Sequence, residues 1–310
     1  VNKPDATIEG LTDGDTRGLY GGADDTSNCG TLEYVRIEFA GYEAFVDNEL
    51  NGLTMGGCGS NTIVRYVQVH MTVDDGIEMF GGTADLRHVV VTRAGDDSLD
   101  WDQGWRGRVQ FAIVKQGPDQ GDNGIEADNL EDAHLSLPMT EPEVWNITLI
   151  GSGNDELSQR GAILRRGMGV AMQNMLMAGF TNEAIDIRDV ETVDNIPDRL
   201  FLDYGMIFDI GADGTSFFSS EAGEDDDDGG LDEEAWATTN DVTLGVDPQF
   251  QGDIFATDGI HVVPAAGSPA ASGGTPPQGE FWDQSADYMG AVRPGSTTTW
   301  YDGWTAMPEN

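Results

Sequence analysis

The sequence predicts an all-β protein, a right-handed parallel β-helix with a loop-rich carboxy-terminal cover. Three observations support this. A short unit of alternating apolar residues recurs along the chain, its copies are about 22 residues apart, and Gly, Asn or Asp stands at the corners between them. Glycine makes up 42 of the 310 residues, and no segment has the sustained 3.6-residue apolar period of a surface helix. Such a period is typical of a solenoid, in which each coil buries its apolar face against the next.

The first strand of each coil has an aromatic or polar residue followed by apolar, any, apolar. Its copies are Y-V-R-I at Tyr34, Y-V-Q-V at Tyr66, H-V-V-V at His88, F-A-I-V at Phe111, N-I-T-L at Asn146, N-M-L-M at Asn174 and, more loosely, Y-G-M-I at Tyr204. Steps of 22 and 23 residues precede longer steps of 35, 28 and 30, which indicate inserted loops. We expect an outward aromatic ladder that includes His88. The expected inward pairs are Val35/Ile37, Val67/Val69, Val89/Val91, Ala112/Val114, Ile147/Leu149 and Met175/Met177.

A second unit follows each early copy of the first and predicts a second parallel sheet. It reads N-G-L-T-M from Asn51, D-G-I-E-M from Asp75, D-S-L-D-W from Asp97, N-G-I-E-A from Asn123 and, more loosely, E-A-I-D-I from Glu183. The alternatives are a β-sandwich and a β-propeller, and the period excludes the propeller, which needs a longer unit of about 40–50 residues. The expected inward pairs here are Leu53/Met55, Ile77/Met79, Leu99/Trp101 and Ile125/Ala127.

The repeat divides the chain into three parts. Residues 1–29 are predicted to be an irregular lead-in or partial coil, and residues 30–212 the parallel β-helix. Residues 213–310 lose the repeat but keep a dense set of aromatic residues, so we expect them to pack on the solenoid as a cover.

Composition limits the function classes. Lys and Arg number 15 against 56 Asp and Glu, a formal net charge of −41. Such a polyanion is unsuited to nucleic acid or an anionic membrane surface, and no apolar stretch is long enough to span a bilayer. No signal peptide, nucleotide-binding, zinc or serine-hydrolase motif is recognisable. Dense carboxylates with few lysines suggest a secreted or extracellular, cell-surface-associated protein. Cys29 and Cys58 then predict one disulfide, with two free buried thiols as the alternative.

Carboxylates dominate the outward positions of the second strand. Stacked coils place equivalent residues about one strand spacing apart, where like charges repel. Water and salt can screen them, a Ca²⁺ ion can bridge them, or raised pKa values can equip them for acid–base chemistry. The acidic run from Glu221 to Glu234 is a further candidate for a cation loop. The predicted Ca²⁺ ligands are Asp74, Asp75, Glu78, Asp97, Asp100, Asp102, Glu126, Asp128, Asp226 and Asp228.

Several longer motifs resemble secreted right-handed β-helix proteins of marine and gliding bacteria, most of them of unknown function. They are G-T-L-E-Y-V-R-I-E-F-A-G from Gly30, N-E-L-N-G-L-T-M-G-G from Asn48, D-D-G-I-E-M-F-G-G from Asp74, D-D-S-L-D-W-D-Q-G-W from Asp96, and the closing Y-M-G-A-V from Tyr288 and W-Y-D-G-W-T from Trp300. This resemblance covers nearly the whole chain and implies the fold rather than an activity.

The chain also resembles polygalacturonase-type glycoside hydrolases in part. V-D-D-G at Val73 and G-D-D-S at Gly95 are one coil apart, as in that pattern, which would make Asp75, Asp96 and Asp97 the catalytic carboxylates. The G-H-G and R-I-K motifs are missing: G-D-N-G stands at Gly121, and the nearest basic pair, Arg165 and Arg166, belongs to another coil position.

These observations predict an extracellular, calcium-stabilised β-helix with a non-catalytic surface, adhesive or assembly role. The alternative is a polysaccharide-active hydrolase or lyase that uses the clustered carboxylates. Possible partners are an extracellular polysaccharide and further copies of the chain, since a solenoid end exposes unpaired strand edges.

Overall fold

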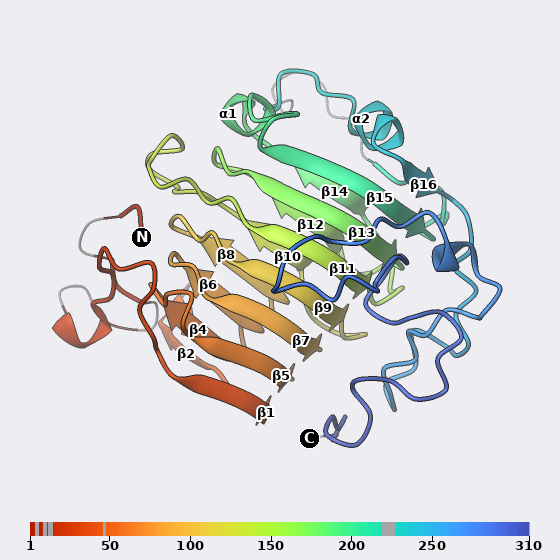
Figure 1. Ribbon diagram of the computed structural model, residues 1–310, viewed down its shortest axis with the longest axis horizontal. Coiled ribbons are helices and arrows are strands. Elements are labelled where there is room, and N and C mark those ends of the chain that lie inside the picture. Colours follow the sequence, from red (N-terminus) through yellow and green to blue (C-terminus); the bar gives the residue numbers. More distant parts are fainter. Residues whose placement is uncertain (4–5, 9–10, 12–14, 46–47, 219–226, 310) are drawn as a thin grey trace.

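The computed structural model describes residues 1–310 except 4–5, 9–10, 12–14, 46–47, 219–226 and 310. Its strands wind into a solenoid with two parallel sheets, which confirms the predicted right-handed parallel β-helix (Figure 1). No helix among the described residues is long and apolar enough to cross a membrane.

The larger sheet has eight strands, all paired in parallel. The predicted register holds, since Val35 pairs with Val67 and Val67 with Val89. In spatial order the strands are β1 (Thr31–Glu38), β5 (Ile63–His70), β7 (Asp85–Thr92), β9 (Arg108–Lys115), β11 (Glu143–Ile150), β13 (Val170–Ala178), β15 (Leu200–Phe208) and β16 (Val242–Leu244).

The second sheet has six shorter strands, and it also is parallel throughout. Its members are β4 (Leu53–Gly56), β6 (Ile77–Phe80), β8 (Leu99–Asp102), β10 (Asn123–Ala127), β12 (Arg160–Leu164) and β14 (Glu183–Ile187). The apolar pairs predicted for the two sheets all contribute to one core between them. Val35, Ile37 and Leu53 of the first coil are partly buried, and the other members of the pairs are buried.

Each strand of the larger sheet from β1 to β15 contains one residue in the left-handed region. These residues are the predicted column of Tyr34, Tyr66, His88, Phe111, Asn146, Asn174 and Tyr204, with φ between 53° and 63°. The first four rings stack, with successive centroids 4.6, 4.5 and 4.9 Å apart. The aromatic ladder is therefore confirmed, and it lies where each strand bends.

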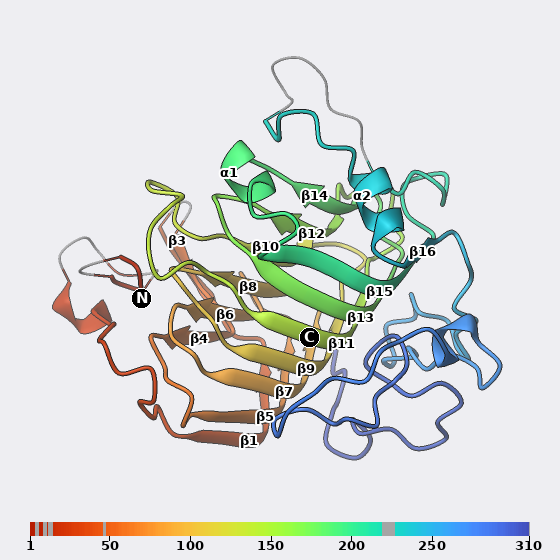
Figure 2. The same ribbon diagram turned by 45° about the horizontal axis from the view of Figure 1, so that its top comes forward.

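The carboxy-terminal segment covers the outer face of the larger sheet beyond this bend (Figure 2). Outward residues such as Val90 and Ile113 are fully buried beneath it. Amide side chains hold it by its backbone: Gln68 both donates to the Ala306 carbonyl (2.6 Å) and accepts from the Ala306 N–H (2.9 Å). Gln110 and Asn174 form the same kind of pair with Asp283 and Thr275.

Shorter elements close the remaining surfaces. At the last coil, α2 (Glu233–Thr239) packs Trp236 into the core. The lead-in lies along the flank of the early coils, where Tyr20 contacts Phe80, and the predicted Cys29–Cys58 disulfide joins it to the turn after β4. The other elements are the 3₁₀ helices Thr16–Gly18 and Pro269–Ala271, the antiparallel hairpin of β2 (Tyr42–Phe45) and β3 (Asn48–Leu50), and α1 (Val190–Val193).

The ladder generates a prediction about His88. Its Nδ1 is buried without a partner among the described residues, and burial, with the nearby Arg87, lowers the pKa of His88 from 6.5 to about 4. Phe111 shows that phenylalanine fits this left-handed position. We expect His88→Phe to stabilise the fold by about 1 kcal/mol near pH 7.5, because it removes an unpaired polar atom and keeps the stack.

The stabilisation by His88→Phe should be larger near pH 5 than near pH 7.5. Between pH about 4 and 6.5 the unfolded chain binds a proton at His88 that the folded chain does not, so the wild type loses stability as pH falls through this window. Urea unfolding of both proteins at the two pH values measures the difference. A gain that is equal at both would contradict the lowered pKa.

Candidate functional site

An acidic pocket of about 500 Å³ lies on the outer side of the second sheet, where turns lead into β6 and β8. The β2–β3 hairpin contributes to its lining. Among the described residues that line it, none is basic and nine carry carboxylates. The lining residues are Glu43, Glu49, Val73, Asp74, Asp75, Glu78, Gly95, Asp96, Asp97, Asp100 and Glu126.

The deepest carboxylates belong to a corner column of Asn51, Asp75, Asp97 and Asn123. Asp75 Oδ1 accepts the N–H of Asp97 at 2.9 Å, and Asp97 Oδ1 accepts the N–H of Asn123 at 2.6 Å. Each side chain thus ties one coil to the next, which an asparagine oxygen could do equally well. The negative charges at Asp75 and Asp97 are therefore not required by this hydrogen bonding, although both residues are buried.

These charges are electrostatically unfavourable in the folded protein. Burial is the largest cause that raises the pKa values of Asp75, Asp97 and Asp100 well above their usual range, and neighbouring carboxylates raise them further. At the pocket mouth, burial together with Asp96 and Glu49 raises the pKa of Asp74 to about 6. A carboxylate that must be ionised here needs a compensating positive charge.

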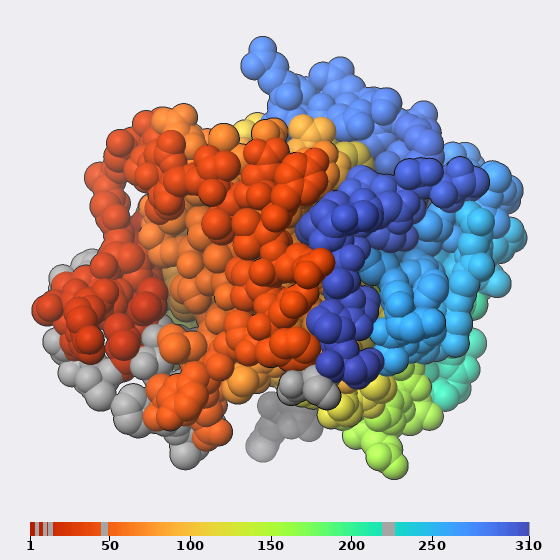
Figure 3. Space-filling view, turned by 90° about the horizontal axis from the view of Figure 1, so that it is seen from below, coloured from red at the N-terminus to blue at the C-terminus, as the bar shows by residue number. Residues whose placement is uncertain are grey.

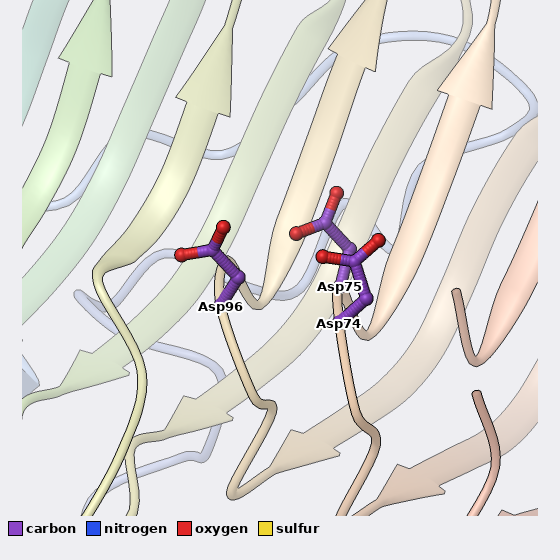
Figure 4. Close-up of side chains that lie close together, drawn as sticks. All are labelled: Asp74, Asp75 and Asp96. Carbon is purple, nitrogen blue, oxygen red and sulfur yellow. The ribbon is translucent and has the colours of Figure 1, made fainter. Parts of the chain in front are cut away.

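Three groups of carboxylates are close enough to share a cation. One oxygen from each of Asp75, Glu78 and Asp100 lies within 4.8 Å of the others. Asp74, Asp75 and Asp96 form a second such group at the turns before β6 and β8 (Figure 4). A third contains Asp96, Asp97 and Asp122. Ca²⁺ takes six to eight oxygen ligands, and carboxylates from adjacent coils supply several of them.

Two unpartnered oxygens belong to the innermost group and its neighbour. Among the described residues, the structure provides no hydrogen-bond partner for the buried Oδ1 atoms of Asp100 and Asn51. Asn51 is 9% exposed, and its Nδ2 donates to Glu78, so the side chain is directed at this group. Buried oxygens without a donor are positions at which a water molecule or a cation can be accommodated.

Arginines balance the carboxylates on the next coil. Arg165 Nε donates to Asp128 at 2.8 Å, and the same guanidinium pairs with Glu126. Arg166 also pairs with Asp128. The predicted ligands Glu126 and Asp128 are therefore paired with arginines, whereas none of the described residues that line the pocket on the coils of β6 and β8 is basic.

The other predicted ligands are not brought into these groups. Asp102 lies at the end of β8 and does not line the pocket. Asp228 Oδ1 accepts the N–H groups of Gly230 and Leu231 at 2.7 and 3.2 Å. Asp226 lies outside the described residues.

The three candidate catalytic carboxylates, Asp75, Asp96 and Asp97, all line the pocket. One oxygen of Asp75 lies within 4.8 Å of one oxygen of Asp96, close enough for both to reach one ion. This spacing favours a shared cation, and the hydrolase assignment stays a prediction.

Sequence reasoning missed Glu43 and Glu49. They come from a hairpin inserted between the two sheet strands of the first coil, so they belong to neither repeating column. The alternation of Tyr42 and Glu43 with Glu49 and Leu50 around a short connection was the available signal for this hairpin.

Comparison with known proteins gives one match. A family model described as a pectate-lyase-like β-helix domain matches residues 7–221. Neither a curated protein nor a solved structure matches the chain.

The corner column generates a prediction about stability. We expect Asp75→Asn and Asp97→Asn to stabilise the metal-free protein by about 1–2 kcal/mol near pH 7, because each keeps the inter-coil hydrogen bond and removes a buried charge. Asn123→Asp is the reverse change in the same column and should destabilise it. Urea unfolding in EDTA measures all three. Loss of stability in both Asp→Asn variants would show that the charges belong to the fold itself.

Proposed function

We propose a function for this chain that rests in part on its family: the chain belongs to the pectate-lyase-like β-helix family, which is related to polysaccharides. The proposed function is that of an extracellular calcium-binding protein. Its bound Ca²⁺ holds an acidic polysaccharide without cleaving it. The observation that carries the proposal is the convergence of Asp75, Glu78 and Asp100 within 4.8 Å in a pocket whose described lining residues include no base.

The three groups differ in exposure, and this suggests two roles. Asp75 and Glu78 are buried, so the inner group would hold a resident ion. Asp74 is partly buried and Asp96 exposed, so an ion at the outer group would keep open positions. Uronate carboxylates and hydroxyls are hard oxygen ligands of the kind that Ca²⁺ accepts. Without a cation, the carboxylates of the pocket would repel a polyuronate.

The Cys29–Cys58 disulfide supports an extracellular location, because disulfides persist in oxidising compartments. A non-catalytic role is supported by the pairing of Arg165 and Arg166 with Glu126 and Asp128, which leaves neither guanidinium unpaired at the pocket.

Calcium should stabilise the protein in a pH-dependent way. At about 100 times its Kd, Ca²⁺ should add about 2.7 kcal/mol to the free energy of unfolding. The folded-state pKa of Asp74, about 6, is above the ordinary 3.8, so the metal-free fold loses stability from this group as pH rises through about 6. Ionisation of Asp74 in the same pH window adds a negatively charged oxygen ligand to the outer group. The rise in Tm with CaCl₂ should therefore be smaller near pH 4.5 than above pH 7.

Thermal unfolding in CaCl₂ and in EDTA, with Tb³⁺ luminescence as a direct binding probe, tests this. Asp100→Asn and Glu78→Gln should abolish the calcium effect. The exposed Glu280→Gln is the matched control and should retain it. A Tm that does not respond to CaCl₂ at pH 7.5 would contradict the proposal.

Polysaccharide binding should depend on the same cation. We expect the protein to bind polygalacturonate in CaCl₂ and to lose it in EDTA, with no binding to neutral dextran. Asp74→Asn and Asp96→Asn should weaken binding at least about tenfold through the outer group. Co-sedimentation measures binding, and assays for unsaturated products and new reducing ends measure cleavage. Depolymerisation that Asp75→Asn abolishes would replace this account with the enzymatic alternative.

A further inference from the structure

The outer edge of β1 has no strand partner among the described residues. β1 is the first strand of the larger sheet and pairs only with β5. The described lead-in residues lie along the flank, with Tyr20 against Phe80 and the Asn2 N–H bound to the Gln103 carbonyl. In Figure 3 the orange-red surface of this coil lies open between the amino-terminal segment and the dark blue carboxy-terminal segment. A strand edge of this kind is a template for another strand.

The stack of rings and the column of inward apolar residues both end at β1, and no further described residue continues either of them on the outer side. Tyr34 is 60% exposed: Tyr66 stacks on its ring at 4.6 Å, and Trp304 contacts it edge-on at 6.2 Å. Val35 and Ile37 are only partly buried, whereas Val67 and Val69 of the next coil are 0% exposed. Another strand on β1 would extend both the ring stack and the core.

The opposite end of the solenoid offers a much shorter edge, since β16 has three residues and β1 has eight. There, β16 pairs with β15, and Trp236 and Ala237 of α2 pack into the core. The strand that matches the β1 edge in length is the β1 of a second copy, which it can meet in an antiparallel arrangement. That arrangement is a closed two-fold interface, which uses the same surface on both copies.

Two pairs of β1 residues are complementary about the point between Tyr34, which is exposed, and Val35, which packs against the core. The left-handed residue at Tyr34 shifts the in–out alternation, so Leu32 and Ile37 face inward while Glu33 and Arg36 face outward. A two-fold axis at this point places Glu33 opposite Arg36 of the second copy, and Leu32 opposite its Ile37. Opposite charges and apolar residues at facing positions stabilise antiparallel pairs.

The charged residues of β1 are all paired with residues of opposite charge. Arg65 pairs with Glu33 at 3.0 Å and Arg36 with Glu38 at 2.9 Å. We propose that two copies of this chain associate head to head through antiparallel pairing of their β1 edges, with the two Tyr34 rings at the centre. This proposal is independent of the calcium site.

Sedimentation velocity of the full chain tests it. The net charge of −41 opposes association, so the 33.3 kDa monomer should dominate in about 10 mM NaCl. In about 1 M NaCl, where the Debye length is about 3 Å, the mass should approach twice that value as concentration rises. The measurements are made in EDTA, so bridging by cations at the acidic pocket cannot produce the dimer.

Two substitutions locate the contact. Tyr34→Asn removes the ring but keeps a residue that this column accepts in the same conformation at Asn146 and Asn174, and it should weaken the dimer about tenfold or more. Tyr42→Asn is the matched control: Tyr42 is 67% exposed but lies on the hairpin, so association should be unchanged. Near-equal Tm values would show that both variants fold.

A constant mass of 33.3 kDa in high salt at every concentration would overturn the proposal. So would equal association of wild type and Tyr34→Asn, or equal weakening by both substitutions. If Tyr34→Asn instead impairs polysaccharide binding while the wild type stays monomeric, the ring is a sugar platform and the dimer is excluded. Calcium binding is unaffected by either result, so the two proposals fail separately.

Discussion

The stacking of one coil on the next constrains everything else in this protein. Equivalent residues of adjacent coils are separated by one strand spacing of about 4.8 Å. Because equivalent positions carry similar side chains, similar side chains contact each other along the solenoid. For Val67, Val89 and their equivalents this produces a continuous core, and for Tyr34, Tyr66 and His88 a stack of rings. For Asp75 and Asp97 the same geometry produces electrostatic repulsion.

In the acidic pocket, the stacking of coils lowers the stability of the fold, because it places carboxylates beside one another. Asn51 and Asn123 show that the corner column can be built from uncharged residues, and the hydrogen bonds at Asp75 and Asp97 need only an oxygen. The arginines form their ion pairs with Glu126 and Asp128 one coil further on, and no arginine is among the described residues that line the pocket. A divalent cation would turn this cluster from a destabilising element into a binding site.

The fold could be predicted from the sequence because residues that stack in one column recur at regular intervals along the chain. The two apolar patterns predicted the register of the larger sheet from β1 to β13 and of β4, β6, β8 and β10 in the second sheet. They also predicted the ladder around His88 and the shared face of Asp75, Glu78 and Asp100, since these properties follow from coil length alone. Glu43 and Glu49 could not be placed in this way, because an inserted hairpin has no counterpart in other coils. Nor did periodicity predict Arg165 as the partner of Glu126, because the long insertion before β12 obscures its register. The hydrogen bonds by which Gln68 and Gln110 hold the carboxy-terminal segment are made to backbone groups, so a pattern of side chains in the sequence could not predict them.

The central claim is that a cation occupies the space between Asp75, Glu78 and Asp100. The most direct test is a crystal structure of the protein grown with CaCl₂ at neutral pH, with anomalous difference density to identify the ion. The account predicts a peak coordinated by these three carboxylates at about 2.3–2.6 Å. Density that fits only water at this position, in a pocket open to the crystal solvent, would contradict it.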